Sequence, residues 1–184
     1  MAAIGAALAL TAGACSDATA GGFGFPGAAP SLDALGRATL QAVVQGDTAR
    51  LDGFRLTRQE HNDVVWPELP ASAPEVGMPV DLVWADIERR NDRALNRILP
   101  ALAGRRLDYV GTSCRGGLQA FGSFHVLTDC WVTFDAPDRA GEGPVAVPRF
   151  EVQFFKDVLV RDAGYKVFRY YEELPRPAGR SAVP

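Results

Sequence analysis

Few residues of this chain have the type and spacing that catalysis requires. His125 and Asp129 fall on one face of an alternating segment, and such a pair could serve acid–base chemistry. Residues four apart on a strand lie about 13 Å from each other, so these two side chains cannot share a hydrogen bond. We expect both to face solvent, and the sequence predicts no catalytic residue.

The chain is also poor in metal ligands and in cofactor-binding motifs. It holds two histidines, and Glu60-His61 lacks the second histidine one helical turn later that a metalloprotease zinc site needs. The serines beside glycines, Ser113 and Ser123, do not stand in a Gly-x-Ser-x-Gly elbow. We therefore expect no metal and no cofactor.

Four residues are candidates for a binding pocket. Asn91 interrupts the apolar face of a long amphipathic segment, and a buried Asn needs hydrogen-bond partners, which a ligand or a neighbouring backbone group can supply. Trp66, Trp84 and Tyr109 could line the mouth of the same pocket. The alternative for all three aromatic residues is an ordinary place in the core, because large aromatic side chains are mostly buried.

The three cysteines divide by position. Cys15 ends an apolar leader, whereas Cys114 and Cys130 stand in the C-terminal half of the chain. An exported protein folds where thiols oxidise, so the latter two are candidates for a disulfide that would stabilise the chain by about 3 kcal/mol. The alternative is two small buried apolar residues.

Residues 2–14 are small or apolar and are too few to span a bilayer. Thr11-Ala12-Gly13-Ala14-Cys15 resembles the lipobox of bacterial lipoproteins. That resemblance implies lipidation of Cys15, which becomes the new N-terminus. Because Ser16 follows the cysteine, it also implies the outer membrane, facing the periplasm, in a Gram-negative cell. The alternative is a disordered Ala/Gly segment with an incidental cysteine.

Composition indicates one folded domain. The chain has 184 residues, 47% of them hydrophobic and 22% charged, and its net charge is -3. The sequence has no basic stripe of the kind that binds nucleic acid. We expect a signal peptide with a lipobox over 1–15, a flexible Gly/Pro-rich linker over 16–30, the folded domain over 31–174 and a disordered tail over 175–184.

The elements that must position any site are predicted from periodicity and caps. Apolar spacing and capping residues predict helices over 31–46, 47–54, 57–66 and 79–104, with an extended strap over 67–79. Beyond 105 the apolar period falls to two, which predicts strands over 107–111, 124–135, 150–154 and 165–171, with turns at 116–117 and 162–164. Helices followed by an antiparallel meander indicate an α+β fold with the helices packed on a curved sheet.

This element order, with Gly164-Tyr165-Lys166-Val167-Phe168 as its last strand, resembles the nuclear-transport-factor-2-like cone, also called SnoaL-like or cystatin-like. Trp66-Pro67-Glu68-Leu69-Pro70 is similar to a segment of uncharacterised exported bacterial proteins of this kind. The resemblance covers about residues 32–174. It implies a superfamily of isomerases, dehydratases and scaffold domains, so it leaves the activity open.

Two functional hypotheses follow. The first is a lipid-anchored, non-catalytic envelope module that binds a small apolar ligand or another envelope protein. The alternative is a metal-independent SnoaL-like enzyme acting on a small apolar substrate inside the cone. A homodimer formed through the sheet face, with Leu127 and Trp131 in the contact, is a further expectation.

Overall fold

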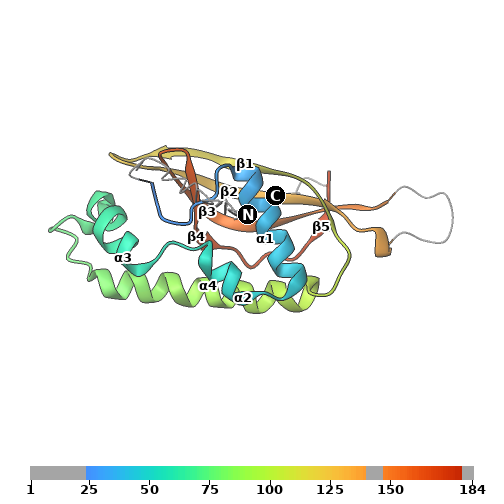
Figure 1. Cartoon of the computed structure of the whole chain (residues 1–184). Coiled ribbons are helices and arrows are strands. Elements are labelled where there is room, and N and C mark those ends of the chain that lie inside the picture. Colours follow the sequence, from blue (N-terminus) through green and yellow to red (C-terminus); the bar gives the residue numbers. More distant parts are fainter. Residues whose placement is uncertain (1–23, 140–146, 180–184) are drawn as a thin grey trace, which may run out of the picture.

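The computed structural model describes residues 24–139 and 147–179 of the chain. Helices precede strands, so the prediction of an α+β fold is confirmed (Figure 1). The elements are α1 (Leu32–Gln45), α2 (Thr48–Gly53), α3 (Arg58–Glu60), the π-helical turn η1 (His61–Val65), the 3₁₀ turns η2 (Trp66–Glu68), η3 (Pro70–Ser72) and η4 (Pro137–Arg139), α4 (Val80–Leu102), β1 (Asp108–Ala120), β2 (His125–Asp135), β3 (Arg149–Arg161), β4 (Gly164–Tyr170) and β5 (Arg176–Pro177).

The strands form one antiparallel sheet in the order β1-β2-β3-β4, and β5 pairs with β3. Register shifts interrupt the β1–β2 pairing at Tyr109/Gly111 and again at Cys114/Gly117. Bulges of this kind bend a strand and increase its local twist. In Figure 1, α2, α3 and α4 lie below the sheet, α4 runs along its length, and α1 crosses in front of the strands from β1 toward α4.

The helix ends are set by local capping interactions that the sequence predicts. Ser31 caps α1 by accepting a hydrogen bond from the backbone of Ala34, and Gly46 ends the helix with φ 67°. Thr57 and Glu60 form the expected capping box of α3.

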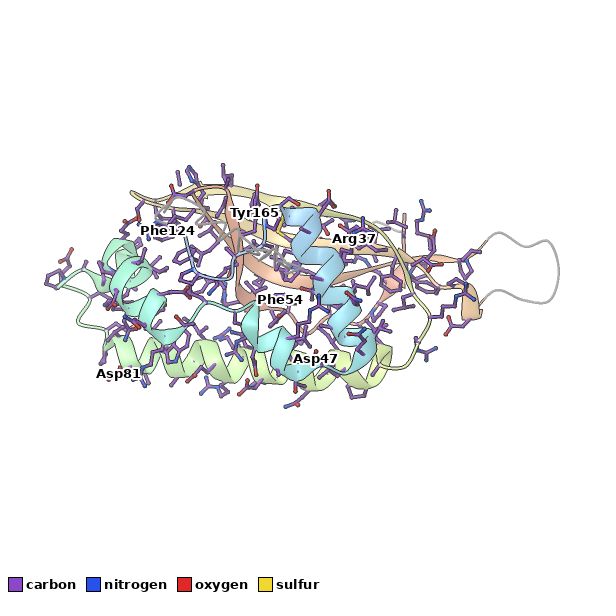
Figure 2. The ribbon with its side chains drawn as sticks, viewed as in Figure 1. Arg37, Asp47, Phe54, Asp81, Phe124 and Tyr165 are labelled. Atoms are coloured by element: carbon purple, nitrogen blue, oxygen red, sulfur yellow. A yellow bond between two sulfur atoms is a disulfide. The ribbon has the colours of Figure 1, made fainter. Side chains whose placement is uncertain are left out.

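Apolar side chains fill the space between the helices and the sheet (Figure 2). Ile98 of α4 is fully buried, as its position on the apolar stripe predicts. A smaller group, here called the end cluster, lies beside the main core and comprises Phe25, Leu56, Val65, Phe124, Val126 and Leu159.

The predicted linker over 16–30 is wrong for its last seven residues. Phe25 is buried in the end cluster, and Ala29 exchanges two backbone hydrogen bonds of 2.9 Å with Tyr165. These contacts supply the buried apolar area and the backbone partners that composition alone does not reveal. Residues 1–23, which include the predicted signal peptide and Cys15, lie outside the described residues.

The predicted disordered tail is wrong for 175–179. β5 pairs with β3 through Arg176 and Pro177, and the Arg176 guanidinium lies 3.9 Å from the ring centre of Trp131. Arg176 also donates to Glu151 at 2.9 Å. A Pro-rich segment is thereby fixed by one aromatic side chain and one carboxylate that stand earlier in the sequence.

Two smaller predictions are also corrected. The glycines at 116–117 do not form the turn, because β1 continues through them as a bulge with Gly117 at φ 93°, and the chain reverses at Phe121–Phe124 instead. The predicted helix over 57–66 divides into α3, η1 and η2, and the strap begins with short 3₁₀ turns. Pro67 and Pro70 favour such turns, since proline fits the start of a helical turn.

Candidate functional site

The structure does not bring the four predicted pocket residues into one cavity. Asn91 and Trp84 lie on the buried face of α4, whereas Tyr109 lies on β1 against α1. Trp66 is half-buried in η2 and contacts Trp84 only through His61, which stands between them. These four residues therefore do not share one pocket, and Tyr109 instead borders a separate hollow with Arg37, Leu40, Gln41, Val44 and Leu107.

Asn91 is a backbone clamp. Its Oδ1 accepts a 2.7 Å hydrogen bond from the backbone N–H of Tyr170, and its Nδ2 donates to the Phe168 carbonyl at 3.4 Å. Asn91 is 1% exposed, so it supplies these two backbone groups of β4 with hydrogen-bond partners away from solvent. The sequence left open whether Asn91 binds a ligand or neighbouring backbone. Its two hydrogen bonds go to backbone groups, and they fix β4 to α4.

An aromatic cluster surrounds His61 at one end of α4. The imidazole is fully buried, and its ring centre lies 5.2 Å from Trp84, 6.0 Å from Trp66 and 6.1 Å from Phe168. Nδ1 lies 2.8 Å from Asn62 Oδ1, while Nε2 has no hydrogen-bond partner among the described residues. Burial lowers the pKa of His61, opposed by the hydrogen bond to Asn62.

Tyr109 is held in a polar contact between α1 and β1. Its hydroxyl donates to Asp33 at 2.5 Å and lies 2.7 Å from the Thr112 hydroxyl, and the Arg37 guanidinium lies 4.3 Å from its ring centre. Burial raises the pKa of Tyr109 to about 12, and the hydrogen bond to Asp33 adds to the effect. A phenol with a pKa this high is a poor general base at neutral pH.

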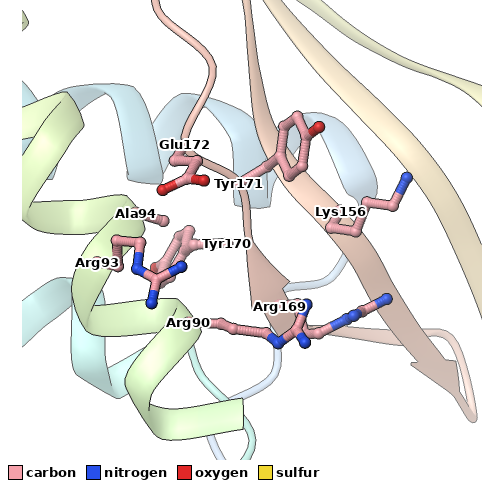
Figure 3. A pocket seen from close by; sticks show the side chains of 8 residues that line it. All are labelled: Arg90, Arg93, Ala94, Lys156, Arg169, Tyr170, Tyr171 and Glu172. Atoms are coloured by element: carbon pink, nitrogen blue, oxygen red, sulfur yellow. The ribbon is translucent and has the colours of Figure 1, made fainter. Parts of the chain in front are cut away.

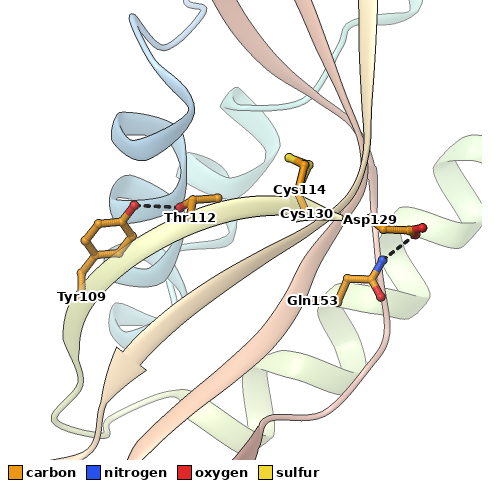
Figure 4. The surroundings of a disulfide bond; sticks show 6 residues. All are labelled: Tyr109, Thr112, Cys114, Asp129, Cys130 and Gln153. Carbon is orange, nitrogen blue, oxygen red and sulfur yellow. Dashed lines mark hydrogen bonds between the residues drawn. A yellow bond between two sulfur atoms is a disulfide. The ribbon is translucent and has the colours of Figure 1, made fainter. Parts of the chain in front are cut away.

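Cys114 and Cys130 are joined by a disulfide (Figure 4). The two residues are directly opposite in the β1–β2 register, because the bulge at the glycines shifts β1 by one residue and the turn lies further along. Next to this bond, Asp129 accepts from Gln153 at 3.0 Å and from Lys156 at 2.5 Å. His125 is exposed and stands four residues before Asp129 on β2, so the two side chains do not form a catalytic pair.

A different set of residues forms a pocket between α4 and the C-terminal end of β4. It has a volume of about 120 Å³ and is lined by Arg90, Arg93, Ala94, Lys156, Arg169, Tyr170, Tyr171 and Glu172. Figure 3 shows Arg90 and Arg93 reaching in from the helix and Arg169 from the strand. This volume is large enough to admit a group of the size of a carboxylate or a phosphate.

The cations of this pocket differ in how they are compensated. Arg90 pairs with Asp86 at 2.5 Å, Lys156 pairs with Asp129, and Arg169 pairs with Asp157. The hydrogen bonds from Arg90 and Lys156 are the largest cause of the lowered pKa of Asp86 and Asp129, respectively.

Two charged residues of the lining remain without such compensation. Among the described residues neither Arg93 nor Glu172 has a salt-bridge partner. The paired carboxylates of Asp86, Asp129 and Asp157 stand outside the lining, and Glu172 is the acidic residue within it. Guanidinium groups have paired N–H donors that match the planar oxygens of carboxylates and phosphates.

Little in the sequence indicates this pocket. Arg90 and Arg93 are three apart and share one side of α4, which is visible in the sequence but is typical of any solvated helix face. Arg169 stands 76 residues after Arg93, and only the packing of β4 on α4 brings the two together.

Comparison of the chain with protein-family models, with curated proteins and with solved structures gave no match. Within 24–139 and 147–179, no group of three or more His, Cys, Asp or Glu residues is arranged to hold a metal ion. No helix in the same residues is long and apolar enough to cross a membrane.

Proposed function

We propose that this chain is a lipid-anchored envelope module that binds a small anion, a carboxylate or a phosphate, in the pocket between α4 and β4. The observation that carries the proposal is the convergence of Arg90, Arg93, Arg169 and Lys156 on one small cavity. Arg93 has no ion-pair partner among the described residues, so it offers an anion an uncompensated positive charge, and the ion-paired Arg90, Lys156 and Arg169 flank it. The ligand proposed here is an anion, whereas the sequence predicted a small apolar ligand.

The location rests on the N-terminal motif and on the cysteines. Residues 11–15 resemble a lipobox, and lipid on Cys15 would attach the module to the cell envelope, facing the periplasm in a Gram-negative cell. The Cys114–Cys130 disulfide supports this location, because disulfides persist in oxidising compartments and are rare in the cytosol.

We further propose that the domain belongs to the nuclear-transport-factor-2-like, or SnoaL-like, superfamily. Its support is the order of helices and strands, the curvature produced by bulges in long strands, and the strand Gly164–Tyr170 that ends the meander. Enzymes of that superfamily work inside the cone. Here Phe134, Phe154 and Phe155 fill the corresponding space, so we favour binding over catalysis.

Isothermal titration calorimetry of the whole chain with inorganic phosphate and with succinate tests the anion site. Arg93→Gln removes the cation that lacks an ion-pair partner among the described residues, and we expect it to weaken binding about tenfold, as the loss of one charge-assisted contact does. Arg97→Gln is the matched control, since Arg97 lies one turn further along α4 and outside this pocket. Wild-type protein that binds neither probe at millimolar concentration refutes the proposal.

A further inference from the structure

The point at which the N-terminal segment joins the domain lies at one end of the sheet. Gly24 lies against the β3–β4 turn, where a Cβ added to this glycine would be 3.9 Å from the Cβ of Asp162, and Phe25 packs into the end cluster. The β1–β2 turn is at the same end, because His125 pairs with Val160 across β2 and β3. The N-terminal segment therefore joins the domain at the end of the sheet that carries the β1–β2 and β3–β4 turns.

The segment between Cys15 and Gly24 is short. Only the eight residues 16–23 separate them, since 24–30 is packed on the domain, and eight residues can extend over at most about 30 Å. The helix α4 has 23 residues and is about 35 Å long. A lipid on Cys15 would therefore hold this end of the domain within about 30 Å of the bilayer.

Exposed apolar side chains gather at the same end. Among the described residues, four of the seven exposed large hydrophobic side chains are found there: Val76 at 50%, Met78 at 45%, Leu82 at 64% and Leu118 at 61% exposure. Asp81, beside Leu82, and Phe124, at the hairpin turn, mark this end in Figure 2. Glu68 of η2 contacts the β1–β2 turn by accepting a 2.9 Å hydrogen bond from the backbone N–H of Ser123.

We propose that this end, with Val76, Met78 and Leu82 foremost, rests on the lipid bilayer to which Cys15 is anchored. The inference depends on the proposed lipid anchor and adds a fixed orientation to it. Exposed Glu75 and Asp162 at this end disfavour a strongly anionic surface, so the surface that fits is a zwitterionic one such as phosphatidylethanolamine. In this orientation the starts of β1 and β3 point away from the membrane.

The lipidated whole chain, reconstituted into vesicles rich in phosphatidylethanolamine, provides the test. One variant carries Met78→Cys and the control carries Asp108→Cys at the opposite end, and each new thiol is labelled with an environment-sensitive dye. Iodide quenching is measured before and after reconstitution. We expect quenching at 78 to fall about threefold on vesicles, because interfacial side chains leave water, whereas quenching at 108 should stay the same.

Three results would overturn the proposal, each in a different way. Mass spectrometry that shows lipid on Cys15, together with equal quenching at 78 and 108, overturns the orientation while the anchor stands. A chain without lipid mass overturns both. Protection of 78 that arises only after an envelope protein is added also overturns the proposal, because the occupant is then a protein. The anion site is tested separately by titration and does not depend on these results.

Discussion

Helix α4 meets β4 at two places with opposite chemistry. Around Trp84 the contact is apolar and tightly packed, and it encloses His61 with one ring nitrogen that lacks a partner among the described residues. Around Arg93 the contact is open and charged, and its cations face a cavity of about 120 Å³. Asn91 stands between the two on the same helix and binds the backbone of β4.

The contrast separates a buried polar group that only lowers stability from a charged group that can bind a ligand. An unpaired nitrogen packed against three aromatic rings lowers stability and leaves little room for a ligand. Arg93, which has no ion-pair partner among the described residues, stands instead beside an open cavity, where a bound anion would stabilise the folded chain. Only the second arrangement therefore has the properties of a site, and the variants below test this contrast.

The largest effect is expected from Asn91→Ala, which should loosen both places together. It leaves the backbone N–H of Tyr170 and the carbonyl of Phe168 without partners, at a cost of about 2–5 kcal/mol in the free energy of unfolding. Urea denaturation measures this. Asn96→Ala on the exposed face of the same helix is the control, and a similar loss in both variants would show that the clamp is unimportant.

The next effect concerns a bond that touches neither place. Cys114→Ala with Cys130→Ala opens a loop with a sequence separation of 16, and the chain-entropy argument gives a loss of about 3 kcal/mol. Because the disulfide lies on the β1–β2 pair, anion binding in the folded variant should be unchanged. A variant that is as stable as wild type in urea contradicts the expected role of the bond.

A smaller effect depends on pH and belongs to the apolar place alone. Burial lowers the pKa of His61 in the folded chain, so the unfolded chain takes up the proton first as the pH falls below about 6.5. The contribution of His61 is thus complete above that pH and is lost below it, by at most about 1.4 kcal/mol per pH unit. Urea unfolding between pH 7.5 and about 5.5 measures the slope.

Two substitutions identify the group responsible. His61→Phe keeps an aromatic ring in the cluster and should abolish this part of the slope, whereas His125→Gln, at the exposed histidine, should preserve it. A slope that persists in His61→Phe assigns the pH dependence to other groups.

The smallest effect on stability is expected for Arg93→Gln, the variant with the clearest expected effect on binding. Arg93 is exposed and has no ion pair among the described residues, so its loss should change the free energy of unfolding by less than about 0.5 kcal/mol. Thermal unfolding without and with phosphate gives both answers. A large destabilisation without ligand would mean that Arg93 is structural.

Local patterns in the sequence account for the order of helices and strands and for several of their boundaries. The cap at Ser31, the glycine at 46, the capping box at Thr57 and the buried stripe that contains Ile98 all depend on residues within a few positions of one another. Interactions over such distances are encoded in spacing, so they can be predicted without a structure.

The features that join distant segments depend on tertiary packing. Phe25 and Arg176 stand in Gly- and Pro-rich stretches that predict disorder, yet each finds a partner on the sheet. The opposition of Cys114 and Cys130 depends on a bulge and a turn whose positions spacing does not fix. The pocket needs Arg93 and Arg169 side by side, and only the packing of β4 on α4 creates that proximity, since a residue's charge says nothing about its distant neighbours.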